Sequence, residues 1–274
     1  MGSKEVVIVV SVIAFVLLLS LAITVGGLGY VLPLPNVREV ASWYLKTTYN
    51  PFMKLFSAMA PEGVTAIVWD YRGLDTLFET AVFFLAIIGS VAIMRGISLK
   101  GVKYDPEKHG MSLIMKTVTR IVVVMIIAVA GSIALHGHLT PGGGFQGGAA
   151  AAVAPLLVLV VFSKYFMDKI GVSKNAMLVI RSVGLIGIGL TAFAVVLVAL
   201  LSHGQAYVFQ NQPKPYAPLG FPYKAGTSLL GGSLLFFNAC EMFAVAAGFT
   251  IVFLLLALPE REVIKVLRGE KFEH

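Results

Sequence analysis

Six apolar runs, each long enough to cross a bilayer as a helix, decide what this chain can fold into. A bilayer core of about 30 Å requires about 20 apolar helical residues. Runs of this size occupy roughly Val6–Val31, Val64–Met94, Leu113–Leu135, Gly147–Phe166, Ala176–Leu201 and Ser228–Leu258. Charged residues make up only 13% of the chain, against about 25% in soluble domains. The sequence therefore predicts an all-α integral membrane protein of about six transmembrane helices in the cell membrane.

The basic residues predict the orientation of the spans. Most of the 21 Lys and Arg residues fall in segments on the same side as the N-terminus, and cytoplasmic segments carry an excess of such residues. We therefore expect both termini in the cytoplasm and lipid around the spans. Because these charges lie between apolar runs and not on one face, they do not favour nucleic acid as a partner.

The sequence carries no motif for soluble enzyme chemistry. Cys240 is the only cysteine, which excludes an intramolecular disulfide and a cysteine-based zinc or iron–sulfur site. Phosphate-binding loops, nucleophile elbows, zinc-protease motifs and dinucleotide fingerprints are also absent from the sequence. We therefore expect no catalytic residues, no metal site and no cofactor.

The most polar interior stretch, Tyr104–Gly110, predicts a boundary within the chain. Its Asp-Pro followed by charges is typical of a linker, here a cytoplasmic one. We expect a two-span segment with an outer loop at 1–103, the linker at 104–110, and a four-span domain with a short cytoplasmic tail at 111–274. Within the outer loop, Val37–Lys46 and Pro51–Ala60 can form short interfacial helices.

Acidic residues lie at the entrance of the second span. Asp75 and Glu79 are four residues apart and share a helix face, where two acids can pass a proton or hold a cation. A carboxylate at membrane depth marks an ion or proton path by default. The alternative is a capping box of Thr76 and Glu79, with Asp70 and Arg72 paired outside the helix. The depth of Glu79 decides between the two.

A stretch rich in histidine and glycine, LHGHLTPGGGFQGG (Leu135–Gly148), separates the third and fourth spans. Its glycines can present backbone N–H groups at a helix start, as in the broken helices of transporters. His136 and His138 can change charge near neutral pH. The alternative is a tight turn with close packing of helix backbones. The motif residues are Pro141, Gly142, Gly143, Gly144, Gly147 and Gly148.

The last apolar run carries Glu241 near its middle, with Asn238 one turn earlier on the same face. Ionisable groups at this depth usually line water, although the pair could also serve only packing between helices. Together with Asp75 and Glu79, these two residues form the predicted ion pathway.

Basic residues near the predicted inner ends of spans are expected to anchor them at the membrane surface. Lys116 has this place in the third span and Arg181 in the fifth. Lys116 is also a candidate proton relay, together with His136 and His138, because a buried lysine can lose its proton. The loop Ser202–Ser228, rich in aromatic residues and prolines, predicts an ordered outer cap or a docking surface.

Two segments resemble subunits of one kind of complex. GHLTPGGGFQGGAAAA (Gly137–Ala152) resembles the signature of the MnhB/MrpB family, the B subunit of multisubunit Mrp-type cation/proton antiporters. Weaker similarity extends over roughly Gly110–Leu258 and includes GTSLL at Gly226–Leu230. VWDYRGLDTLFETAVFF (Val68–Phe84) resembles the C-terminal membrane part of the large A subunit. The chain looks like a fusion of the two, as in archaeal membrane-bound hydrogenase or sulfane sulfur reductase complexes.

The resemblance implies a complex that couples movement of Na⁺ and H⁺, with other antiporter subunits as partners. Some such complexes add a hydrogenase or sulfur-reducing arm related to respiratory complex I. The resemblance places Glu79 on the family's membrane acid and Asp75 on the Asp of its GLDT run. We therefore expect a non-redox subunit that contributes acids to a sodium/proton path. A structural scaffold, or a haem anchor that uses His136 and His203, are the alternatives.

Overall fold

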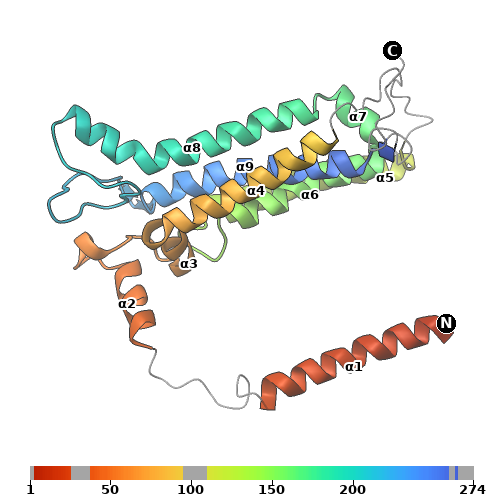
Figure 1. Cartoon of the computed structure of the whole chain (residues 1–274), viewed down its shortest axis with the longest axis horizontal. Coiled ribbons are helices and arrows are strands. Elements are labelled where there is room, and N and C mark those ends of the chain that lie inside the picture. The colour runs from red at the N-terminus through yellow and green to blue at the C-terminus, as the bar shows by residue number, and fades with distance from the viewer. Residues whose placement is uncertain (1–2, 26–37, 95–109, 259–262, 265–274) are drawn as a thin grey trace. The chain divides into compact units, whose positions relative to one another are not determined.

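The computed structural model describes residues 3–25, 38–94, 110–258 and 263–264, and the chain divides into two compact units. The first unit, Met1–Ser42, contains α1 (Ser3–Val25), which is long and apolar enough from Val6 on to span a bilayer (Figure 1). The boundary between the units falls within α2 (Glu39–Thr48). The predicted linker at 104–110 lies outside the described residues apart from Gly110, so a division of the chain there stays a prediction.

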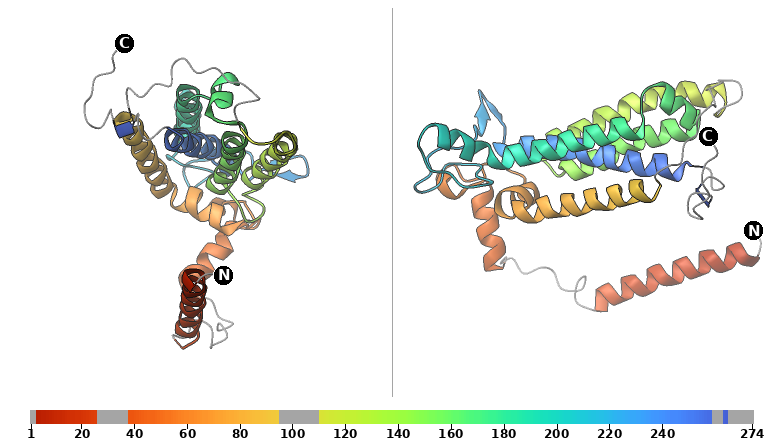
Figure 2. Two further views of the ribbon diagram at one scale, coloured as in Figure 1. Left: turned by 90° about the vertical axis from the view of Figure 1, so that its right-hand side faces the viewer. Right: turned by 45° about the horizontal axis from the view of Figure 1, so that its top comes forward.

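The second unit, Trp43–His274, is a bundle of long helices around α9 (Ser233–Leu256). α9 contacts four other long helices, which are α4 (Gly73–Ile93), α5 (Leu113–Leu135), α6 (Gly144–Phe162) and α8 (Lys174–Leu201). Figure 2 shows α9 with these helices around it. Its sequence is apolar on nearly every side, which is typical of a helix buried in a core.

Short elements cover one end of this bundle, which we call the loop end (Figure 1). They are the 3₁₀ turn η1 (Lys54–Phe56), α3 (Gly63–Thr65), the π-helical turn η2 (Ala66–Tyr71), and the strands β1 (Lys224–Ala225) and β2 (Ser228–Leu229). The strands are antiparallel, with Lys224 opposite Leu229 and Ala225 opposite Ser228. The other end of the bundle carries α7 (Lys164–Lys169) and is called the α7 end.

Six helices among the described residues are long and apolar enough to span a bilayer, which confirms the predicted membrane architecture. The side of the membrane on which the termini lie stays a prediction. Three predicted spans have different bounds. α3 and η2 precede the second span, which begins at Gly73 and not at Val64. The fourth ends at Phe162 because Ser163 has a φ of 99°, which no helix accommodates. The sixth begins at Ser233, after the two strands.

The two short helices expected in the outer loop have different outcomes. A helix forms at Glu39–Thr48, close to the predicted range Val37–Lys46. The second prediction, Pro51–Ala60, was wrong, because only the three residues of η1 are helical there. The backbone N–H groups of Phe52 and Met53 instead bond to the side-chain oxygen of Asn50, which favours a turn over a helix.

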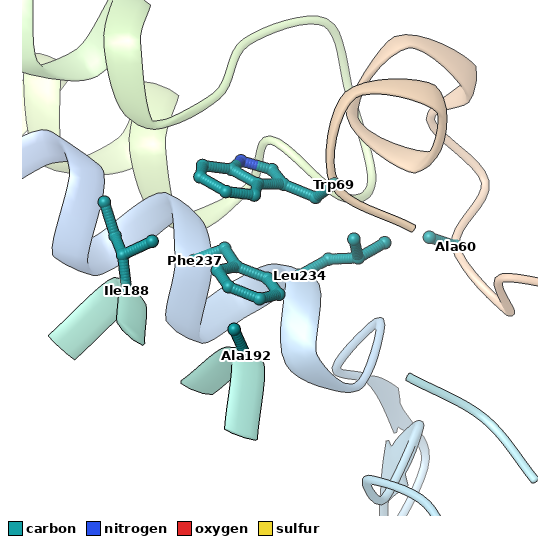
Figure 3. Packing of buried hydrophobic residues seen from close by; sticks show 6 residues of the cluster. All are labelled: Ala60, Trp69, Ile188, Ala192, Leu234 and Phe237. Atoms are coloured by element: carbon teal, nitrogen blue, oxygen red, sulfur yellow. The ribbon is translucent and has the colours of Figure 1, made fainter. Parts of the chain in front are cut away.

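Stacked aromatic rings fix η2 against the bundle (Figure 3). The rings of Trp69 in η2 and Phe237 in α9 lie 4.4 Å apart between centroids and 3° from parallel. The buried side chains around this pair are Ala60, Ile188, Ala192 and Leu234. Truncating a buried aromatic ring of this kind costs roughly 3–5 kcal/mol. The stack therefore holds η2, and with it the start of α4, at a fixed place beside α9.

Candidate functional site

A cavity of about 220 Å³ lies at the loop end of the bundle, between η2, the start of α4, the start of α6 and α9. It brings together residues from all three polar segments singled out in the sequence. Glu79, the glycine turn Gly142–Gly144, Asn238 and Glu241 all line it. Gln146 also lines it, so two carboxylates and two amides from distant parts of the chain share one space, which we call the acid cavity.

Glu79 lies well inside α4 and not at its first turn. α4 begins at Gly73, so Glu79 is about 9 Å along the helix axis from its start. The predicted capping box was wrong, because Thr76 is already helical and its Oγ1 donates to the carbonyl of Val68 at 2.6 Å. The depth of Glu79 thus agrees with the ion-path interpretation more than with the capping one.

Asp75 lies outside the lining of the acid cavity and pairs with Arg72. Arg72 Nη2 is 2.5 Å from Asp75 Oδ2, and Arg72 Nε donates to the same oxygen at 2.6 Å. The predicted pair of Asp70 with Arg72 was therefore wrong. The spacing of three residues at the start of α4 brings Asp75 within reach of Arg72 instead. Since both side chains are exposed, this pair contributes little to stability.

Glu241 and Asn238 form the α9 wall of the acid cavity. Glu241 is 6% exposed, and its carboxylate interacts with the backbone of Phe145, the Trp69 side chain and the charge of Glu79. Asn238 is 1% exposed, and its Oδ1 accepts a hydrogen bond from the backbone N–H of Gly144 at 3.3 Å. Asn238 Nδ2 has no hydrogen-bond partner among the described residues, so it can donate to a water in the cavity.

The glycines of the motif allow backbones to approach closely, as the packing interpretation predicted. A Cβ at Gly144 would lie 2.6 Å from both Glu241 Oε2 and the carbonyl of Asn238. Gly147 and Gly148 lie equally close to α5 and α9, respectively. The motif also presents the Gly144 N–H to Asn238, so packing and presentation of backbone N–H groups occur together. Pro141 lies in the exposed turn before α6.

The three candidate relay residues do not line the acid cavity. His138 is buried beside Gly231, and its Nε2 donates to the carbonyl of Leu229 at 3.1 Å. Burial lowers the pKa of His138, and the hydrogen bond to this carbonyl only partly opposes that change. The lower pKa favours the neutral ring. His136 is exposed beside Ser132, and Lys116 lies at the α7 end, in the first turn of α5. Their role in proton transfer stays a prediction.

Comparison with protein families decides what kind of bundle this is. The model of the domain related to the MnhB subunit of Na⁺/H⁺ antiporters matches residues 114–251, which is about half of the chain. The chain belongs to this MnhB-related family. It is accordingly a multi-pass membrane protein with a domain related to the MnhB subunit.

One relative and two solved structures are similar to this chain. An uncharacterized protein of Methanocaldococcus jannaschii, MJ1307, is 32% identical over 116 residues, which cover 37% of this chain and 44% of that relative. The match thus spans less than half the length of the relative. A chain of the archaeal membrane-bound sulfane sulfur reductase has a similar fold, with a TM-score of 0.62, 24% identity and coverage of 94% of this chain and 100% of that one.

The second solved structure with a chain of similar fold is the Mrp complex from Dietzia sp. DQ12-45-1b. The TM-score is 0.57 and the identity 18%, and the match covers 95% of this chain but 27% of that one. The MnhB-related subunit therefore shares the helical arrangement of only part of this larger chain.

Sequence reasoning missed part of the cavity wall and misplaced one cation. Trp69 and Phe145 line the acid cavity, but their residue types gave no signal of it. Arg181 was expected at the membrane surface and is instead completely buried, with its guanidinium against Phe83 and Phe84 of α4. Tertiary packing explains why Arg181 is buried, because Gly248 of α9 has no side chain and leaves room for the guanidinium.

Asp70 of η2, outside the spans, should make the stability of this subunit depend on pH. Burial raises the pKa of its carboxyl from 3.8 to about 6, and the charge of Lys214 only partly opposes the rise. The stability that the protonated form contributes is complete below about pH 4 and is lost as pH rises through about 6. Asp70→Asn should therefore stabilise the protein at pH 7 by about 1–2 kcal/mol and have little effect at pH 4. Thermal unfolding in detergent measures both values. Equal shifts at the two pH values would contradict the titration of Asp70 as the cause.

Proposed function

We propose that this chain is a non-redox membrane subunit of an Mrp-type Na⁺/H⁺ antiporter module, and that the acid cavity is part of its sodium/proton path. The observation that carries the proposal is the meeting of Glu79 and Glu241 in one cavity of a membrane-spanning bundle. Ionisable groups inside a membrane bundle usually mark an ion pathway. Membership of the MnhB-related family supports sodium and proton as the transported ions.

The chemistry of the acid cavity suits exchange of the two ions. Two ionised carboxylates in a space of low dielectric constant repel one another. A proton on one of them, or a Na⁺ between them, removes this repulsion. Carboxylate and amide oxygens are ligands that hard cations prefer, and Glu79, Glu241 and Asn238 supply both kinds. A site that binds either ion, but gains little from both together, is what antiport requires.

One side of the acid cavity is open, and we propose that a partner subunit covers it. Glu79 and Phe145 are exposed there when the chain is alone. A carboxylate that faces lipid is costly, so we propose that another antiporter subunit covers this side. The fold shared with the sulfane sulfur reductase chain supports a sulfur-reducing arm as a more distant partner, and a hydrogenase arm is the corresponding alternative.

Glu79→Gln in the reconstituted complex should lower Na⁺-dependent proton movement about tenfold or more, because Gln keeps the shape and hydrogen bonding of Glu but cannot carry a proton or a charge. Glu79→Asp should have a smaller effect. Proton uptake by vesicles, measured with and without a Na⁺ gradient, gives the rate, and subunit content of the same samples gives the assembly.

Asp168→Asn is the matched control, because Asp168 is an exposed acid of α7 outside the acid cavity. It should transport at the wild-type rate. A structural scaffold without ion handling predicts a different pattern, with Gln tolerated at Glu79 and Ala harmful through lost assembly. Wild-type transport by Glu79→Gln in a fully assembled complex would support the scaffold and count against the proposed path.

A further inference from the structure

Three phenylalanine rings from three helices lie directly behind the acid cavity, on its α7 side. Phe83 of α4 is one turn past Glu79, and Phe249 of α9 is about two turns past Glu241. Phe145 of α6 lies between the cavity and these two rings. The centroid distances are 5.2 Å for Phe83 and Phe249, 6.2 Å for Phe145 and Phe249, and 6.3 Å for Phe83 and Phe145. We call this cluster the phenylalanine plug.

The guanidinium of Arg181 reaches the plug from α8. Its carbon lies 4.7 Å from the ring centroid of Phe83 and 5.2 Å from that of Phe84. Arg181 Nη1 donates to the carbonyl of Ala244 at 3.1 Å. A Cβ at Gly248 would collide with the same nitrogen, so glycine is needed there. The guanidinium thus lies between Ala244 and Gly248, near the middle of both α4 and α9.

Arg181 forms no salt bridge with an acid in the described part of the chain. Arg181 is 0% exposed, and its Nε and Nη2 have no hydrogen-bond partner there. Arginine keeps its charge in proteins, and the aromatic faces stabilise that charge without cancelling it. A buried, unpaired cation at mid-membrane depth is costly for packing alone, which points to a role in function.

We propose that Arg181 and the phenylalanine plug form a cation-repelling seal at the deep end of the acid cavity. This inference rests on the proposed function, because it assumes that cations enter the cavity. Apolar rings exclude water, and a fixed positive charge raises the energy of any cation that moves past them along α9. Cations therefore leave the cavity sideways, past the exposed Glu79 and toward the covering subunit, and do not cross the membrane through this chain alone.

The position of Arg181 makes the charge strong enough to matter. Its guanidinium lies one to two helical turns, or about 5–10 Å, past Glu241 along α9. At such separations in a protein interior, a unit charge changes the occupancy of a cation roughly tenfold or more. Removal of this charge should therefore cause a measurable increase in Na⁺ leak.

Arg181→Met in the reconstituted complex should raise passive Na⁺ leak, driven by an imposed membrane potential without a proton gradient, about tenfold. Arg181→Lys, which retains the charge, should leak at nearly the wild-type level. Equal leak from the Lys and Met variants, or wild-type leak from the Met variant in an intact complex, would overturn the charge barrier.

Phe249→Ala provides a second test in case Arg181→Met fails to assemble, since it opens the plug and leaves Arg181 in place. Phe253→Ala is its matched control, because Phe253 stacks on Phe249 one turn further from the cavity. Increased Na⁺ leak in Phe249→Ala but not in Phe253→Ala supports the seal. Equal Na⁺ leak in the two variants, or wild-type leak in both, overturns it. Coupled transport by Glu79→Gln, measured in parallel, tests the proposed function separately. Failure of one proposal can thus be distinguished from failure of the other.

Discussion

Glu241→Gln is expected to lower Na⁺-dependent proton movement of the assembled complex about 100-fold, because losing a positioned proton-carrying group typically costs at least that much. Glu241 is more enclosed than Glu79, so water can replace its function less easily. Gln can keep the interactions with Phe145 and Trp69 but cannot titrate. Transport by reconstituted vesicles over a pH series measures the loss.

The matched comparison for Glu241→Gln is Glu241→Asp, which keeps the charge and shortens the side chain by one methylene. It should retain more transport than the Gln variant. Packing as the sole role of Glu241 predicts the reverse order, because the neutral amide of Gln fills the site and Asp leaves a gap. Wild-type rates for Glu241→Gln over the whole pH series, with normal subunit content, would sink the claim that Glu241 carries ions or protons.

The sequence predicted the spans well because their signal is local. Twenty consecutive apolar residues need no tertiary context to be recognised as a membrane helix. Glu241 and Asn238 were placed at depth for the same reason, since apolar residues surround them on both sides. The apolar pattern could not show the bend before α4. The residues around Asp70 have the composition of a helix, but η2 adopts a π-turn whose place depends on the stack of Trp69 on Phe237.

The candidate site was predicted residue by residue but not as one place. Glu79, Gly144 and Glu241 each stood out from apolar surroundings, yet nothing in the sequence joins α4, α6 and α9. The acid cavity results from long-range packing, in which the absence of a side chain at Gly144 admits Glu241. Arg181 shows the limit most clearly. The position of Arg181 in its apolar run suits a surface anchor and a buried cation equally well. Only the space that Gly248 leaves on another helix decides between them.

Gly144→Val is expected to destabilise the subunit by about 3 kcal/mol or more and to reduce the yield of assembled complex. A Cβ there would lie 2.6 Å from Glu241 Cβ and from the carbonyl of Asn238, which cannot move without shifting α9. Overpacking of this kind typically costs 1–3 kcal/mol, and a branched side chain adds further contacts. The thermal midpoint should fall by about 5–10 °C, as measured by unfolding of the complex in detergent.

Gly131→Ala in α5 is the matched control, since nothing lies within 4 Å of a Cβ there. It should gain about 0.5–1 kcal/mol from lower backbone entropy. A Gly144→Val variant as stable as Gly131→Ala would show that α6 and α9 do not depend on this contact.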